Sequence, residues 1–214
     1  MYLFGRQIDI RKHRMFLFGK RIDIYSSFAE NNLGKVIYKT VLDYKPMKIV
    51  EFGVLQGYAT VCMALALKKL GRGKIVSYDD WQPHEPHLCG DIETVKKNLQ
   101  RYKVLHLVEL KTADFFQWVV NPEPFDLLFL DIDNDGRIIE LAITKLQTHI
   151  QKGAVILFEG GSEQRDNLDF VIANNQAPMY PLREKLGFKV LDRRHPSISI
   201  CTKDVKYSYR PGRD

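Results

Sequence analysis

The segment that indicates a chemical function most clearly contains two glycines, which lie between an acidic residue and an apolar stretch with helical spacing. Residues 51–60 read Glu-Phe-Gly-Val-Leu-Gln-Gly-Tyr-Ala-Thr, which places Gly53 and Gly57 four positions apart, directly after an apolar run at 49–52. Glycine removes a side chain that would block a ligand and lets the backbone turn tightly. In open sheets of parallel strands, ligands collect at the carboxyl ends of the strands. The spacing therefore predicts a ligand-binding turn between a strand and a helix.

A carboxylate at the end of the next predicted strand indicates which ligand this turn would hold. Asp79 lies in Ser-Tyr-Asp-Asp-Trp, twenty-two residues after Gly57, where it can accept hydrogen bonds from both hydroxyls of a ribose. A glycine loop with such an acid indicates a cofactor containing adenosine. The nicotinamide fingerprint has three glycines around a pyrophosphate, whereas this loop has two, and Glu51 would repel a phosphate. The residues therefore favour a cofactor with an ammonium group and no phosphate, which describes S-adenosylmethionine (SAM).

Strand and helix patterns alternate along the chain and must position these residues. Since the last two strands are too close for a helical crossover, they must pair antiparallel. We expect an α/β fold: a Rossmann-like, seven-stranded, mostly parallel sheet with an antiparallel last strand and helices on both faces. The expected strands are 49–52, 74–78, 105–110, 125–131, 154–158, 188–191 and 197–202, and the expected helices run from Ser26-Ser27 to about 44 and over 58–70, 91–101, 114–120, 137–150 and 178–186.

The 214 residues fit one domain with short additions. We expect an N-terminal extension at 1–25, an α/β domain at 26–203 that contains the glycine loop and Asp79, and a basic tail at 204–214. The extension contains Leu-Phe-Gly-x-x-Ile-Asp-Ile twice, at 3–10 and 17–24. This repeat is either a local duplication whose second copy attaches to the domain, or an arm that covers the site or a partner subunit.

The net charge of +6 is concentrated at the two ends of the chain, and residues 26–202 are balanced at 22 basic and 22 acidic residues. A groove that follows phosphates needs cations clustered on the folded body, so we expect no nucleic-acid partner. No apolar run approaches the roughly 18 residues that span a bilayer, so no membrane partner is expected. Three widely spaced cysteines argue against a disulfide framework, and we expect a cytoplasmic protein.

The chain resembles class I SAM-dependent methyltransferases in three consecutive segments. These are the motif Glu-Phe-Gly-x-x-x-Gly-Tyr-Ala-Thr, the apolar helix residues Met63–Leu67 and the start of the next strand at Gly73–Val76. Within them the chain is most similar to the catechol and caffeoyl-CoA O-methyltransferase type and its bacterial small-molecule relatives, over roughly residues 30–203. The resemblance implies methyl transfer from SAM to a small-molecule acceptor, with a hydroxyl as the expected target. A homodimer is among the assemblies that it allows.

The resemblance also implies which residues hold the cofactor. Gly53 and Gly57, with Glu51 in the same loop, would surround the methionine moiety. Asp79 would bind the ribose, and its neighbour Asp80 is the second candidate. Trp81 would pack beside the adenine, and the pair Ala113-Asp114 would meet the adenine edge. Asp114 also reads as a helix N-cap before Phe115, and both roles are compatible.

Asp131, which ends the strand at 125–131, lies where methyl transfer would occur. Methyl transfer is an in-line displacement, so the acceptor oxygen must be aligned with the methyl group and deprotonated. In metal-dependent relatives, an acid at the position of Asp131 and a pair after the fifth strand bind a divalent cation. Here Asp131, Asp133 and Glu159 offer oxygen ligands suited to Mg²⁺, Mn²⁺ or Ca²⁺. The chain departs from the pattern at Gly160, where Asp or Asn is usual. The alternative is a turn-rich acidic loop without a metal.

A second departure concerns the base, since Asn134 stands where relatives often keep Lys or His. His84 and His87, in a proline-rich loop after the second strand, are candidate replacements with suitable pKa values; alternatively they are exposed loop residues or zinc ligands. Arg165 and Asp166 either line the acceptor pocket or belong to a surface loop. The rival functions are a degenerate SAM-binding protein without catalysis and, less favoured, a nucleic-acid methyltransferase. The acceptor itself is not readable, because loops choose it.

Overall fold

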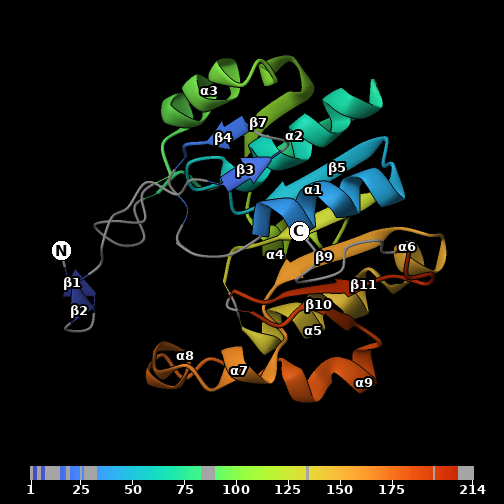
Figure 1. The fold of residues 1–214 in the computed structure, drawn as a ribbon. Helices are drawn as coiled ribbons and strands as arrows, with labels where there is room; N and C mark the ends of the chain where they lie inside the picture. Colours follow the sequence, from blue (N-terminus) through green and yellow to red (C-terminus); the bar gives the residue numbers. More distant parts are fainter. Residues whose placement is uncertain are drawn as a thin grey trace.

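A seven-stranded sheet runs through the molecule in the order β10-β11-β9-β8-β5-β6-β7 (Figure 1). The computed structural model describes residues 2–3, 6–7, 15–17, 20–24, 26, 33–82, 90–133, 135–194 and 196–206. The strands of the sheet are β5 (Lys48–Phe52), β6 (Lys74–Asp79), β7 (Val108–Thr112), β8 (Leu127–Leu130), β9 (Val155–Glu159), β10 (Lys189–Asp192) and β11 (Ile198–Cys201). Strands β9, β8, β5, β6 and β7 pair in parallel, and β11 is antiparallel to both β9 and β10. The predicted fold class is confirmed.

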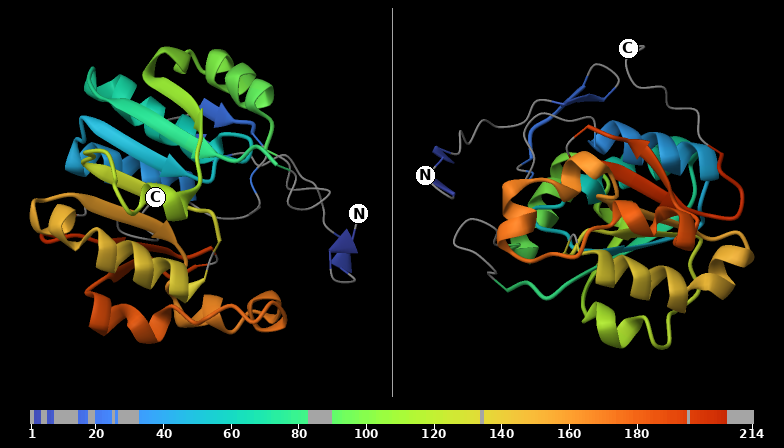
Figure 2. Two further views of the ribbon diagram at one scale, coloured as in Figure 1. Left: turned by 180° about the vertical axis from the view of Figure 1, so that it is seen from behind. Right: turned by 90° about the horizontal axis from the view of Figure 1, so that it is seen from below.

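Helices cover both faces of this sheet, as the views in Figure 2 show. Along β8, Leu127 and Phe129 join one buried apolar cluster, while Leu128 and Leu130 join the other, on the opposite face. A strand buried on both faces must be apolar at every position, which explains the continuous run of leucine and phenylalanine. The first cluster includes α1 (Leu33–Tyr44), α2 (Tyr58–Leu70) and α3 (Ile92–Arg101); the second includes α4 (Phe115–Trp118), α5 (Gly136–Lys145) and α6 (Gln147–Gln151).

The central strand β5 has β6 on one side and β8 on the other. The chain leaves β5 for α2 and β6, and then returns across β5 to reach β8, so the direction of winding reverses between β5 and β8. The carboxyl edge at such a reversal is where open α/β sheets bind ligands. The fold therefore places the predicted glycine loop at the carboxyl edge of the sheet, where folds of this kind bind their ligands.

Several predicted elements have different bounds in the structure. The expected helix at 137–150 is two helices, α5 and α6, divided at Leu146. The expected strand at 105–110 begins with η1 (Leu105–Leu107), so β7 starts only at Val108. The expected helix at 178–186 shortens to η2 (Tyr180–Leu182) and α9 (Arg183–Leu186), because a proline early in η2 cannot donate a backbone hydrogen bond. Two short helices, α7 (Glu163–Asp166) and α8 (Asp169–Ala173), were not predicted.

Each copy of the N-terminal repeat contributes an antiparallel hairpin: β1 (Tyr2–Leu3) with β2 (Arg6–Gln7), and β3 (Met15–Leu17) with β4 (Lys20–Ile22). In the second copy, Ile22 and Ile24 are buried in the first apolar cluster, which contains α1, α2 and α3. The backbone NH of Asp23 donates to the Tyr102 hydroxyl at 2.7 Å. The corresponding residues of the first copy lie outside the described residues. Among the described helices, none has the length and apolar character to cross a membrane.

Candidate functional site

A cavity of about 730 Å³ lies at the carboxyl edge of the sheet, along the ends of β5, β6, β7 and β8. Its volume is within the range of small-molecule sites. Four chain segments supply the residues that sequence analysis singled out in its lining: Gly53 after β5, Asp79 and Asp80 at β6, Ala113 and Asp114 after β7, and Asp131 and Asp133 after β8. The structure therefore brings residues as far apart as Gly53 and Asp133 to one site.

Gly53 allows two strand ends to touch. Its φ is +88°, and a Cβ atom at this position would lie 2.0 Å from the carbonyl oxygen of Asp131. Only glycine fits where the backbone after β5 packs directly on the backbone after β8. Gly57, with φ +82°, precedes α2, and a Cβ there would lie 3.1 Å from Cγ1 of Val95. Gly57 thus shapes the turn without lining the cavity.

Glu51 is fully buried within β5 and is not among the residues that line the cavity, and its predicted contact with the cofactor stays a prediction. Its Oε2 accepts hydrogen bonds from the hydroxyls of Thr60 at 2.8 Å and Ser77 at 2.5 Å. Burial raises the pKa of Glu51 to about 8, against the opposing effect of these two bonds. The side chain joins β5 to the first turn of α2 and to β6, and thereby fixes the base of the loop.

The carboxylate of Asp79 holds the glycine loop in place. Oδ2 accepts the backbone NH groups of Val54 at 2.7 Å and Leu55 at 3.3 Å, and Oδ1 accepts the NH of Trp81 at 3.0 Å. A carboxylate offers about four lone-pair sites, so a position remains for a ligand hydroxyl. Leu55 adopts a positive φ of 51°, a strained conformation for a non-glycine residue, and Asp79 stabilises it.

The side chain of Trp81 is not among those that line the cavity. Its φ of 58° turns the chain, and its side chain packs against the cluster that contains α1, α2 and α3. Asp80 does line the cavity, and its Oδ1 accepts the NH of Gln82 at 3.0 Å. The place of Trp81 beside the adenine stays a prediction.

Aromatic residues that the sequence analysis did not assign to the site form another part of the cavity wall. Phe115 and Phe116 follow Ala113 and Asp114, and all four line the cavity. Phe115 packs edge-on against the ring of Phe52, whose partner Tyr78 stacks at 4.9 Å. The expected N-cap is present, since Oδ1 of Asp114 accepts the NH of Gln117 at 2.9 Å. The Phe-Phe pair directly after a strand-end acid was the available signal for this wall.

Asp131 and Glu159 form an acid pair at the ends of β8 and β9. Their carboxyl groups hydrogen-bond to each other, and burial raises the pKa of Asp131 against that bond. Asp131 lines the cavity, whereas Glu159 lies behind it and is buried. Two acids in such contact cannot both ionise freely, and burial favours the neutral form of Asp131.

The three acids predicted to bind a metal are not assembled as a ligand set. The Oδ1 atom of Asp133 accepts the side-chain NH₂ of Gln176 at 2.8 Å. Within the parts of the chain that the structure describes, no three His, Cys, Asp or Glu side chains are grouped to hold a metal ion. The described residues therefore do not present Asp131, Asp133 and Glu159 as a ligand set that fits a divalent cation.

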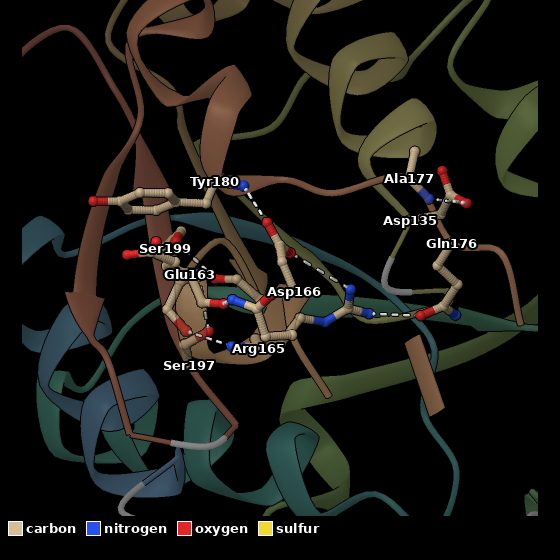
Figure 3. Close-up of polar contacts among 12 residues, drawn as sticks. Asp135, Glu163, Arg165, Asp166, Gln176, Ala177, Tyr180, Ser197 and Ser199 are labelled. Carbon is tan, nitrogen blue, oxygen red and sulfur yellow. Dashed lines mark hydrogen bonds and ion pairs between the residues drawn. The ribbon is translucent and has the colours of Figure 1, made fainter. Parts of the chain in front are cut away.

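Arg165 is fully buried, and it neither lines the cavity nor belongs to a surface loop. Figure 3 shows its guanidinium between Gln176 and Asp166. His84, His87, Asn134 and His195 lie outside the described residues, so the predicted roles of the two loop histidines remain predictions.

The chain is similar to proteins of one kind in all comparisons. A family model described as a methyltransferase domain matches residues 50–159. A catechol O-methyltransferase of Niastella koreensis is 31% identical over 107 residues, which are 48% of this chain and 44% of that protein. The chain thus aligns with less than half the length of this relative.

Solved structures share the fold at low sequence identity. Cofactor-bound Rv0187 from MTB has a TM-score of 0.57 at 21% identity, over 84% of this chain and 83% of that one. An O-methyltransferase from Bacillus cereus in complex with SAH has a TM-score of 0.53 at 19% identity, over 84% of both chains. TomG of Streptomyces achromogenes, in complex with SAM, gives 0.52 at 18%, over 83% and 81%. With its family match, its sheet order and its cavity at the carboxyl edge, this chain belongs to the methyltransferase-domain family.

Proposed function

We propose that the protein transfers the methyl group of SAM to a hydroxyl oxygen of a small-molecule acceptor. The observation that carries the proposal is one continuous cavity that joins the Gly53–Asp79 loop to Asp131. The relatives described as bound to SAM or SAH support the choice of cofactor. When bound, SAM would supply an electrophilic methyl group on its sulfonium.

The cofactor end is the part of the cavity between the glycine loop and α4. We assign the methionine moiety to the backbone near Gly53, where no side chain intervenes, and the ribose to the free lone pair of Asp79. The wall of Ala113, Asp114 and Phe115 offers an apolar face and a carboxylate for the adenine. Asp80 remains the second candidate for the ribose.

The acceptor end is the part of the cavity beyond Asp131. It is lined by Ile132, Ile138 and Phe170, which suit an apolar or aromatic body, and by the polar pair Asp133 and Gln176. We assign to Asp131 the role of accepting the proton of the acceptor hydroxyl, with Glu159 as the partner that shares it. His84 or His87 is the alternative base. Because the acid residues are not arranged as a ligand set, no divalent cation is part of this proposal.

The test is methyl transfer from radiolabelled SAM to a panel of phenols, sugars and natural-product hydroxyls, with wild type and Asp131→Asn compared. We expect transfer to at least one acceptor and a loss on the order of 100-fold in the variant, the usual size of general-base catalysis. Unchanged turnover in Asp131→Asn would assign the base elsewhere, and the matched His84→Ala and His87→Ala variants would then locate it. SAM binding without transfer to any acceptor would favour the non-catalytic alternative.

A further inference from the structure

A fully buried arginine lies beside the acceptor end of the cavity. Arg165 is among the largest side chains that solvent does not reach. It sits in α7, and its backbone NH donates to the N-cap hydroxyl of Ser162 at 3.2 Å. Burying a guanidinium without compensating charge is costly. Its position therefore requires an electrostatic explanation.

The immediate contacts of Arg165 compensate it only in part. Nη2 donates to Oε1 of Gln176 at 2.9 Å, and Nη1 lies 3.8 Å from Oδ1 of Asp166. Neither Nε nor Nη1 has a hydrogen-bond partner among the described residues. Asp166 is itself held in place, since its Oδ2 accepts the NH of Tyr180 at 2.7 Å (Figure 3). One long ion pair and one amide leave most of the donor capacity of the guanidinium unused.

The remaining compensation comes from the acids at the strand ends. Burial lowers the pKa of Arg165, while Asp166, Glu159, Asp133 and Asp135 act in the opposite direction and favour its charged form. Glu159 belongs to the acid pair with Asp131, which bears one negative charge when it holds one proton. Gly160 directly follows Glu159, and a Cβ atom on Gly160 would lie 3.7 Å from Nε of Arg165, so the guanidinium lies beside the end of β9.

Gly160 explains how an arginine comes to lie there. The family resemblance implies a second metal ligand at this position, directly after Glu159. Instead, a Cβ atom at Gly160 would lie 2.7 Å from Sδ of Met179 and 3.7 Å from Nε of Arg165. The space that a ligand side chain would need is therefore already filled by Met179, with the guanidinium next to it.

We propose that Arg165 provides, from within the protein, the positive charge that in metal-dependent relatives a divalent cation brings to these strand ends. Through Gln176, which bonds both Arg165 and Asp133, the same residue also positions the Asp133 carboxylate at the acceptor end. This second role rests on the proposed function, whereas the charge replacement does not. Arg165 is a positioning residue, because it does not line the cavity.

The decisive experiment is a Mn²⁺ titration of the wild-type protein, followed by electron paramagnetic resonance of the free ion. Because the described acids are not grouped as a ligand set and a guanidinium lies beside the end of β9, we expect no saturable Mn²⁺ site. Melting temperatures with EDTA, Mg²⁺ or Mn²⁺ should coincide. A stoichiometric Mn²⁺ site that Asp131→Asn abolishes would overturn the proposal. SAM binding is measured separately, so failure of the cofactor assignment would not be mistaken for this result.

Substitution of the arginine tests the charge directly. Arg165→Gln leaves the buried acids without their counterion, and we expect its melting temperature to fall on the order of 10 °C. Arg165→Lys keeps the charge and should recover at least half of that loss. Arg72→Gln, at an exposed arginine, is the matched control and should melt like wild type. Equal stability of Arg165→Gln and Arg72→Gln would contradict the proposal. If Arg165→Gln does not fold, the Mn²⁺ titration of wild type still decides.

Discussion

The two ends of the cavity are built by different means. At the cofactor end, the backbone sets the geometry: Gly53 packs against the carbonyl of Asp131, and the NH groups of Val54 and Leu55 converge on Asp79. At the acceptor end, side chains set the geometry, through Asp133, Gln176 and Arg165, which lie in three separate segments. Both arrangements join segments that are far apart in the sequence, but backbone groups fix the first and side-chain hydrogen bonds fix the second.

This difference predicts how each end responds to mutation. Changes in the cofactor end should act through backbone strain and through ligand hydrogen bonds. Changes in the acceptor end should act through the charge balance of buried groups, as described for Arg165. The predictions below probe the cofactor end and its supports, in order of decreasing effect.

The largest effect is expected for Gly53→Ala. A Cβ 2.0 Å from a backbone oxygen cannot be accommodated unless the ends of β5 and β8 separate. We expect loss of SAH binding in calorimetry together with severe destabilisation or failure to fold. Gly71→Ala is the matched control, because Gly71 has φ +69° but an added Cβ meets nothing within 4 Å. It should cost only about 1 kcal/mol of stability. Similar effects of the two substitutions would refute the close-contact explanation.

A smaller effect is expected from the ionisation of Glu51. Burial raises its folded-state pKa to about 8 from an ordinary 4.5. Since the folded pKa lies above the unfolded one, its stabilising contribution is complete below about pH 4.5 and is lost as the pH rises toward 8. The loss is about 5 kcal/mol at most. Wild type should therefore lose more melting temperature between pH 5 and 8 than Glu51→Gln, which cannot ionise. Parallel melting curves would exclude Glu51 as the cause.

Asp79→Ala should weaken SAH binding by about 10- to 100-fold, the value of lost charge-assisted hydrogen bonds. The substitution removes both the loop contacts and the proposed ribose ligand. Asp79→Asn keeps one carbonyl oxygen and should lie between Asp79→Ala and wild type. Asp80→Ala is the neighbouring control, and an effect larger than that of Asp79→Ala would transfer the ribose role to Asp80.

The smallest effect separates the two readings of Asp114. Asp114→Ser preserves an N-cap acceptor for α4 but removes the carboxylate. We expect an unchanged melting temperature and a several-fold loss of SAH affinity. Asp114→Ala should in addition lose roughly 1 kcal/mol of stability. Full affinity in Asp114→Ser would leave only the capping role.

Local sequence was sufficient where the backbone decides the structure. Helix α2 has the predicted bounds, because Gly57 and Gly71 take left-handed conformations at its two ends. The mostly parallel direction of the strands also followed from the alternation of patterns, as did the antiparallel last strand. The cofactor loop was predicted for the same reason, although Glu51 proved to be a buried support and not a lining residue.

Local sequence was insufficient where distant side chains decide it. Arg165 lies in a short polar segment that resembles a surface loop, and it is buried because Gln176 and the Tyr180-bound Asp166 enclose it. The metal triad was expected from residue types, but its three acids are not grouped as a ligand set among the described residues. The sequence also did not show the positive φ of Trp81 or the packing of its side chain on the cluster that contains α1, α2 and α3. These features depend on contacts between segments that no local pattern records.

The central claim is that the cavity at the end of β5 and β6 holds SAM. The most direct test is titration calorimetry of the wild-type protein with SAM and with its demethylated product SAH. We predict saturable binding of both at one site per chain, weakened in Asp79→Ala and unaffected by EDTA. Absence of heat and of any melting-temperature shift with either ligand would contradict the account.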